Sequence, residues 1–232
     1  MPCSPVMPDG ANKSPMPDDR DHTPCPACRL HAWLCLCTHA PRVATRTSLL
    51  LVVHVHELGR TSNTARLLAL AVSGATLVGH GGREPPADLA AHVPAGATPV
   101  VLFPGRGART LTPELVAALP SPLALVVPDG NWKQAARMVK RLPLLAAAVK
   151  VSLPARVFAG SALRRNRPGR MSTYEAVAQA LGLLEGEAVA GPLLDFYRRA
   201  TDRMLLVRGK LKAGDVYGGI DGPRPMNIQP LC

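Results

Sequence analysis

Four cysteines stand close together near the start of this 232-residue sequence and could hold a metal ion. Within 13 residues they follow the pattern C-x2-C-x6-C-x-C, as Cys25, Cys28, Cys35 and Cys37. Four thiolates suit the tetrahedral coordination of structural zinc, and so short a segment has little else to hold it together. Disulfides or redox chemistry are a second possibility, although an expected cytoplasmic location argues against them. Buried cysteines without a metal are the third.

A second candidate for chemistry is Asp129, in the stretch PDGNWKQAARM. The apolar run 123–127 ends just before it, and a basic helical pattern follows at once. In α/β proteins the carboxyl ends of strands carry binding and catalytic residues, which favours a chemical role for this carboxylate. Asp-Gly is also a common turn, and an aspartate here can simply cap the next helix. The residues alone leave both interpretations open.

Two further segments could contact an anionic ligand. LFPGRGART (102–110) passes from an apolar run into a glycine-rich loop with two arginines, so its backbone could approach such a group closely. RRNRPGRMSTYEAVAQAL (164–181) brings four arginines to the start of a helical pattern, a surface that suits phosphates. Ser172 and Glu175 in this segment have capping-box spacing. Neither segment is a Walker loop or a G-x-G-x-x-G fingerprint.

These residues need a scaffold, and the rest of the sequence predicts an α/β fold with a mostly parallel sheet and helices on both faces. Apolar runs typical of strands covered on both faces occur at 48–55, 75–79, 98–103, 122–127 and 149–153. Helical patterns occur at 62–72, 113–119 and 131–141, and two later ones begin at Ser172 and near Pro192. Thr61 or Ser62 is the expected N-cap of the first helix.

We expect three parts in the chain. Residues 1–20 are rich in Pro, Ser and Asp and lack periodicity, which predicts a disordered tail. Residues 21–42 contain the cysteines, and we expect them to form a zinc-binding segment with a small core of its own. Residues 43–232 form the α/β domain, which is long enough to bury a substantial core.

The charge of the sequence is uneven. The net charge is +11, and residues 133–212 contain 16 of the 27 Lys and Arg but only 5 of the 16 acidic residues. So concentrated an excess favours a polyanion-binding face, because charge that only aids solubility is more naturally spread out. No apolar run approaches the roughly 20 residues that span a bilayer, and the N-terminus lacks the order of a signal peptide. We therefore expect a cytoplasmic protein that does not enter a membrane.

The sequence resembles the DTW-domain family, the tRNA-uridine aminocarboxypropyltransferases, in five segments that occur in the same order. They are the cysteine cluster, HELGRTSNTARLL (56–68), LFPG (102–105), PDGNWKQAARM (128–138) and RMSTYEAVAQAL (170–181). The resemblance runs from about Cys25 to the long C-terminal helix. It implies a SPOUT-like α/β domain with a trefoil-knotted cofactor site. The transfer that it implies needs no metal, so we expect the zinc to be structural.

The resemblance also implies the reaction. S-adenosylmethionine would donate its 3-amino-3-carboxypropyl group to N3 of a tRNA uridine, typically in the variable loop, and methylthioadenosine would leave. The macromolecular partner is then tRNA, and no obligate protein partner is evident.

Individual residues gain roles from the resemblance. Asp129 becomes the candidate base that takes the proton from N3. The expected contacts of S-adenosylmethionine lie in strand-end loops: Leu102, Phe103, Pro104, Gly105, Pro128, Gly130, Asn131, Trp132, Met171, Ser172 and Thr173. A place in the core is the alternative for Trp132. The expected contacts of tRNA phosphates are Arg60, Arg164, Arg165, Arg167 and Arg170.

One residue departs from the family pattern Asp-x-Thr-Trp, because Asn131 stands in place of the threonine. Asparagine is also short, polar and a good helix cap, so we expect a conservative exchange. Two other functions stay open. A SPOUT-type RNA methyltransferase would release S-adenosylhomocysteine, and a non-catalytic zinc-containing RNA-binding protein would not bind S-adenosylmethionine.

Overall fold

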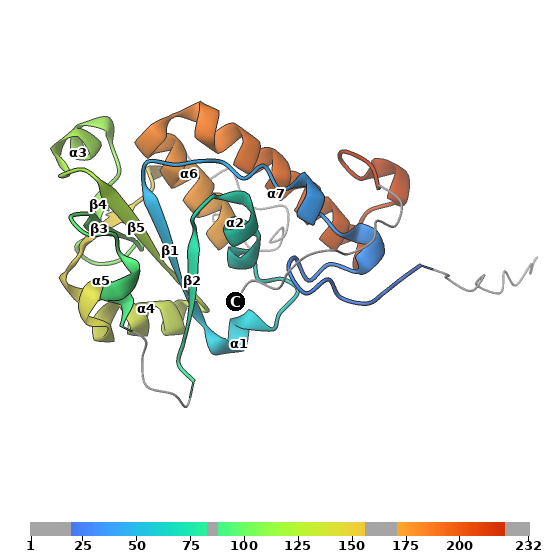
Figure 1. The fold of residues 1–232 in the computed structure, drawn as a ribbon, viewed down its shortest axis with the longest axis horizontal. Coiled ribbons are helices and arrows are strands. Elements are labelled where there is room, and N and C mark those ends of the chain that lie inside the picture. The colour runs from blue at the N-terminus through green and yellow to red at the C-terminus, as the bar shows by residue number, and fades with distance from the viewer. Residues whose placement is uncertain (1–19, 83–87, 156–170, 221–232) are drawn as a thin grey trace, which may run out of the picture.

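The computed structural model describes residues 20–82, 88–155 and 171–220 (Figure 1). Residues 1–19 of the expected tail therefore lie outside the described part of the chain. The arginine-rich stretch before the last two helices lies outside it as well, with Arg164, Arg165, Arg167 and Arg170.

Within the described residues, six parallel strands form one sheet in the order β2-β1-β5-β3-β6-β4. The strands are β1 Ser48–His54, β2 Thr76–His80, β3 Thr98–Leu102, β4 Arg109–Thr110, β5 Leu123–Asp129 and β6 Val149–Ser152. Five of them agree with the apolar runs of the sequence to within two residues, which confirms the predicted α/β fold. The exception is β4, whose two residues are exposed and give no apolar signal.

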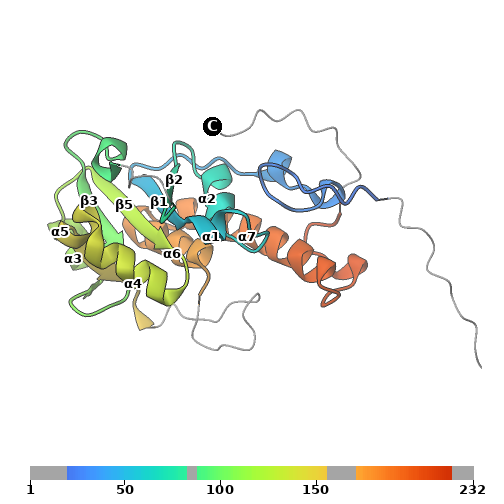
Figure 2. The same cartoon turned by 90° about the horizontal axis from the view of Figure 1, so that it is seen from below.

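Helices cover both faces of the sheet, as predicted (Figure 1, Figure 2). The α-helices of the described segments are α1 Val55–Leu58, α2 Ala65–Ala71, α3 Pro113–Ala118, α4 Trp132–Arg141, α5 Pro143–Ala147, α6 Thr173–Glu185 and α7 Glu187–Val207. Side chains alternate along the strands: Leu49, Leu51 and Val53 of β1 share a core with α2, α6 and α7. Leu50 and Val52 face the opposite core, with α4 and α5. The sheet is thus the middle of three layers.

The helix α2 begins at Ala65, later than the sequence predicts. The backbone N–H of Arg66, in its first turn, donates at 3.1 Å to Oδ1 of Asn63 and not to the expected oxygens of Thr61 or Ser62. The prediction of those two residues as N-cap is therefore wrong. Asn63 lies closer to the helical turn and supplies an equally good acceptor.

The last helix, α7, begins at Glu187, five residues before the predicted start near Pro192. A proline inside a helix lacks the N–H that would bond to the carbonyl four residues earlier, here that of Ala188. Ala188 is exposed in the first turn, so water can satisfy its carbonyl, and the fixed φ of proline already suits a helix. The break that a proline signals in a sequence is therefore misleading at this position.

Every helix in residues 20–82, 88–155 and 171–220 is too short or too polar to span a lipid bilayer. The implied trefoil knot stays a prediction, because the connection between β6 and α6 includes residues 156–170, which lie outside the described part. The division of the chain at residues 42 and 43 also stays a prediction.

Candidate functional site

Asp129 is the last residue of β5, at the edge of the sheet where the parallel strands have their carboxyl ends. β5 lies between β1 and β3, with β2 beyond β1 on one side and β6 beyond β3 on the other. Open α/β sheets bind their ligands at such a point, where the order of the strands reverses. Asp129 is 7 % exposed, so its carboxylate is almost enclosed.

The starts of two helices hold this carboxylate in place. Asn63, just before α2, donates from Nδ2 to Oδ2 of Asp129 at 2.8 Å. Thr173, the first residue of α6, donates from its hydroxyl to the other oxygen, Oδ1. Asn63 is itself oriented, because its Oδ1 accepts the N–H of Arg66. Each carboxylate oxygen thus accepts from a donor that a helix positions.

The cap of α4 is Asn131, so the alternative interpretation of Asp129 as that cap is wrong. Asn131 Oδ1 accepts the backbone N–H of Gln134 at 3.0 Å, while Gln134 Oε1 accepts the N–H of Asn131 at 2.7 Å. The two bonds form a complete capping box. A Cβ on Gly130 would lie 3.0 Å from Gln134 Oε1, so the glycine leaves room for this box.

We expect Asn131→Ala to lower the free energy of unfolding by about 1 kcal/mol, because it removes the side-chain acceptor of the capping box. Asn131→Thr, which restores the residue of the family motif, should cost roughly half a kcal/mol or less, since a threonine hydroxyl also caps helices. Urea denaturation of the three proteins measures the difference. An alanine variant as stable as the wild type would show that the box contributes nothing.

Trp132, the first residue of α4, is a surface residue. It is 59 % exposed, and its ring stacks on that of Phe103, with the ring centroids 5.0 Å apart and the planes 24° from parallel. The alternative that places Trp132 in the core is therefore wrong. The buried tryptophan of the chain is Trp33.

The three loops that were expected to contact S-adenosylmethionine follow β3, follow β5 and precede α6. Leu102 and Pro128 are buried at the strand ends, whereas Pro104 and Gly105 are exposed beyond β3. Because β3 pairs with β5, the first two loops leave the same edge of the sheet as Asp129. The structure thus brings the first two loops to one edge, and their contacts with the donor stay a prediction.

In the third loop, two side chains already have partners within the protein. Ser172 caps α6: its Oγ accepts the N–H of Glu175 at 3.2 Å, and Glu175 Oε2 accepts the N–H of Ser172 at 2.8 Å. This confirms the predicted capping box. Thr173 is the donor to Asp129, and Met171 is half-buried and packs against the core. Of the three residues, Thr173 is the one whose side chain reaches the carboxylate.

Arg60 lies in the loop between α1 and α2, beside the segment that supplies Asn63. Its Nη1 is 3.0 Å from Oε1 of Glu57. An exposed pair of this kind contributes at most about 1 kcal/mol, so the guanidinium stays able to contact a phosphate. Its role in tRNA binding stays a prediction.

Asn63 is the residue of this site that the sequence did not reveal. It lies 66 positions from Asp129, and no local pattern joins the two. Thr64 is a similar case, because its Oγ1 accepts the N–H of Tyr174 in α6 at 3.3 Å. Both are buried polar residues, and buried polar side chains require partners, but the partner can be found only once the fold is known.

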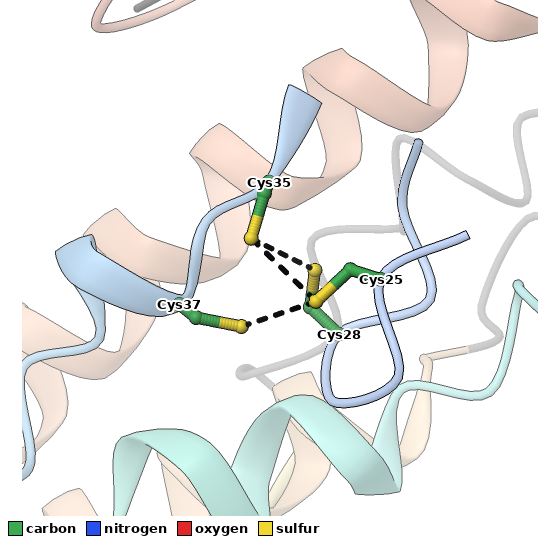
Figure 3. Close-up of side chains that lie close together, drawn as sticks. All are labelled: Cys25, Cys28, Cys35 and Cys37. Atoms are coloured by element: carbon green, nitrogen blue, oxygen red, sulfur yellow. Dashed lines mark hydrogen bonds between the residues drawn. The ribbon is translucent and has the colours of Figure 1, made fainter. Parts of the chain in front are cut away.

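The four cysteines lie together with their thiols pointing inward (Figure 3). All four are free, so the disulfide alternative is wrong for this structure. The Sγ atom of Cys25 lies 3.6 Å from those of Cys35 and Cys37, and Cys28 Sγ lies 3.9 Å from Cys35 Sγ. A tetrahedral zinc with bonds of about 2.3 Å places its sulfurs about 3.8 Å apart. The cluster thus fits a tetrahedral metal ion such as zinc.

The cysteine segment does not have a core of its own, contrary to expectation. Its Leu34 and Leu36 share one core with Leu68 of α2 and Met204 of α7, and the segment lies against these helices in both views (Figure 1, Figure 2). The segment has too few apolar side chains to form a core of its own, so it buries them against α2 and α7.

Arg203 of α7 ties the cysteine segment to the rest of the protein. It is 1 % exposed, and its Nη1 donates to the carbonyls of Leu34 and Cys35 at 3.1 and 3.0 Å. Its Nη2 donates to the carbonyl of Gly219 at 3.1 Å. Loss of these acceptors would leave a buried guanidinium without hydrogen bonds, which is energetically costly. Displacement of the cysteine segment should therefore disturb the C-terminal half of α7.

Fold and site together define an α/β protein with an enclosed carboxylate at the edge where its parallel strands have their carboxyl ends, and with a four-cysteine cluster beside its last helix. The DTW-domain model matches residues 22–205, and the chain belongs to the DTW-domain family. This membership is consistent with a function in tRNA modification. No curated protein and no solved structure matches the chain.

Proposed function

We propose that this protein is an S-adenosylmethionine-dependent tRNA-uridine aminocarboxypropyltransferase, with Asp129 as the base. Membership of the DTW-domain family supports action on tRNA. The family resemblance suggests the transferred group, the acceptor atom N3 and a uridine of the variable loop. The observation on which the proposal depends most is the placement of Asp129 at the sheet edge.

In the proposed reaction, N3 of the uridine attacks the carbon of the aminocarboxypropyl arm that is bonded to the sulfonium. A nitrogen–carbon bond forms and the carbon–sulfur bond breaks. The electron pair of the broken bond stays on sulfur, so methylthioadenosine leaves without charge. The N3 proton passes to a carboxylate oxygen of Asp129, which raises the nucleophilicity of N3 during the attack.

The surroundings of Asp129 support this role. Asn63 and Thr173 only donate to it, so both bonds are compatible with the ionised form that a base requires. Both donors also lie at helix starts, where the helix dipole favours a negative charge nearby. Burial also limits the water that competes for the carboxylate.

The choice between the carbons on the sulfonium is a matter of positioning. The sulfonium activates the methyl, the ribose carbon and the arm alike, so the enzyme must hold the arm, and not the methyl, in line with N3. The loops after β3 and β5 are the parts of the chain proposed to hold the donor. Their exit at the edge that carries Asp129 supports that assignment.

We propose a structural role for zinc at Cys25, Cys28, Cys35 and Cys37. Four thiolates complete a tetrahedral shell and leave no open position for a substrate. The ion would then hold the segment against α2 and α7.

Mass spectrometry of tRNA nucleosides, from cells with and without this gene, tests the proposal. We expect a uridine that carries the 3-amino-3-carboxypropyl group to be lost with the gene and to return with the wild-type copy. A copy with Asp129→Asn at equal expression should restore only traces of it. Loss of a methylated nucleoside instead would favour the methyltransferase, and an unchanged nucleoside profile would contradict both enzymes.

A further inference from the structure

The exposed face of α4 carries a continuous stripe of positive charge. Lys133, Arg137, Lys140 and Arg141 are exposed, and their spacing of four, three and one residues places them along one side of the helix over about 12 Å. From Gly130 to Tyr174 the sequence contains no acidic residue. In the part of the chain that the structure describes, none of the four cations forms an ion pair with a carboxylate.

The stripe begins beside the stacked rings of Trp132 and Phe103. Trp132 precedes Lys133 directly and presents most of its surface to solvent, although it is the largest side-chain type and stacks on Phe103. The two flat rings form a platform at the edge of the sheet that carries Asp129, three residues earlier in the chain. Because Phe103 fixes the orientation of the Trp132 ring, the exposed surface of that ring is available to stack on another aromatic ring.

A hollow of about 420 Å³ continues this surface between α4, α5 and the loop after β3. Phe103 and Gly105 line one side, and Ala136 and Val139 of α4 line another. Three cations lie on its walls: Arg106, Lys140 and Lys150. Lys150 already donates to the carbonyls of Ala146 and Ala148, so Arg106 and Lys140 are the cations left for an anionic group.

We propose that this surface, made of Trp132, Phe103, Arg106 and the cations of α4, is the docking face for the RNA substrate. Phosphates of an unpaired strand contact the cations, and one of its bases stacks on Trp132. The inference rests on the proposed function and adds to it the surface that holds the RNA. It adds this surface to the expected phosphate contacts, Arg60 and the arginines at 164–170.

Stacking of an RNA base explains the exposure of Trp132 better than stacking of the adenine of S-adenosylmethionine. Small-molecule sites bury about 70–90 % of the surface of their ligand. The ring of Trp132 is 59 % exposed, so it could cover a bound adenine from one side only. Single-stranded RNA is bound by the combination present here, aromatic rings for the bases and a basic track for the backbone. An acidic protein could also bind the cations of α4, but it would not account for the stacked rings of Trp132 and Phe103.

The charge contribution is tested with a triple variant, Lys133→Glu, Arg137→Glu and Lys140→Glu. Its matched control is Arg208→Glu, Lys210→Glu and Lys212→Glu. The control makes the same change in net charge on three exposed cations at the end of α7, far from α4 in both views (Figure 1, Figure 2).

With an unmodified tRNA transcript as the probe, the α4 variant should bind at least about 100-fold more weakly at low salt. The slope of log affinity against log salt should become shallower by about 0.7–0.9 for each phosphate that the variant no longer neutralises. The control should bind within about threefold of the wild type. Equal losses in both variants, or a larger loss in the control, would overturn the proposal.

The stacking contribution is tested at Trp132 with a short single-stranded oligouridylate as the probe. Trp132→Ala should weaken its binding by about 5- to 100-fold, and Trp132→Phe should restore most of the affinity because it keeps an aromatic ring. The RNA should quench the fluorescence of the wild type but not of Trp132→Phe, in which the buried Trp33 is the sole tryptophan. Loss of S-adenosylmethionine affinity with unchanged RNA affinity would instead assign Trp132 to the donor and overturn this step.

These binding measurements separate the inference from the proposed function, because they need no chemical step. Transfer to tRNA by an α4 variant of unchanged RNA affinity would overturn the docking face and leave the enzyme standing. Docking of RNA on α4 without any transfer from S-adenosylmethionine would support the face and contradict the proposed reaction. Binding of an acidic peptide with equal affinity and equal sensitivity to Trp132→Ala would contradict a face built for RNA.

Discussion

Asp129→Asn is expected to lower the rate of transfer by about 10² to 10⁴, the usual contribution of a positioned base. Single-turnover assays at saturating tRNA and S-adenosylmethionine measure that rate without the effects of binding or product release. Raising the pH should restore part of the rate of the variant, because more uridine N3 is then ionised before it binds. A variant equally impaired at every pH would mean that Asp129 positions the uridine and does not take its proton.

The same change should also cost stability, which the site explains. Hydrogen bonds to a charged group are worth more than neutral ones by about 1 kcal/mol each, and Asp129 accepts such bonds from Asn63 and Thr173. The variant should therefore lose about 1–2 kcal/mol of unfolding free energy. Loss of activity by partial unfolding must then be separated from loss of the base.

The pair Asn63 and Asp129 offers a control that makes this separation. The double variant Asn63→Asp and Asp129→Asn exchanges the carboxylate and the amide, so the amide at position 129 can donate to a carboxylate at position 63. The N–H of Arg66 keeps its acceptor, and stability should return to within about 1 kcal/mol of the wild type. Activity should stay low, because the carboxylate has moved. A double variant that is as active as the wild type would remove Asp129 from the mechanism.

Removal of zinc is expected to have the largest effect on structure. We expect one zinc per chain in the purified protein and none in Cys28→Ser. In the variant, amides of residues 25–39 should exchange with solvent at least about 100-fold faster, because structural zinc sites supply about 10–16 kcal/mol to the folding of small fingers. Cys232→Ser, which removes a thiol outside the cluster, should leave exchange unchanged.

Loss of zinc should raise amide exchange in α7 but not in the sheet. Arg203 would lose the carbonyls of Leu34 and Cys35 as acceptors, so the C-terminal half of α7 should exchange faster as well. The sheet should keep its protection, since its other core, with α4 and α5, does not include the cysteine segment. Metal analysis that finds far less than one equivalent in freshly prepared, reduced protein would contradict the zinc site.

The strands could be predicted because the sheet is covered on both faces, so that the central strands β1 and β5 are nearly unbroken apolar runs. β5 is the clearest case, with seven consecutive buried residues. β4 gives no such signal, because its two exposed residues pair only with the edge of β6. Pro192 falsely predicts a helix boundary. It leaves the carbonyl of Ala188 without an N–H donor, and this is tolerated within α7 because Ala188 is exposed to water.

The candidate site divides in a similar way. The placement of Asp129 after an apolar run predicted its position at the sheet edge, and the spacing of Ser172 and Glu175 predicted a capping box that is present. Asn63 could not be found, because a hydrogen bond between residues that are far apart in the sequence follows from the packing of α2 against the sheet. The exposure of Trp132 was equally hidden, since its residue type favours burial as much as binding.

The most direct test of the proposed function is an analysis of products with purified protein, an unmodified tRNA transcript and S-adenosylmethionine. We predict one methylthioadenosine released for each uridine that gains a 3-amino-3-carboxypropyl group, and neither product with Asp129→Asn beyond traces. Release of S-adenosylhomocysteine with a methylated tRNA would contradict the proposed function, as would an absence of both products from zinc-loaded protein that binds tRNA.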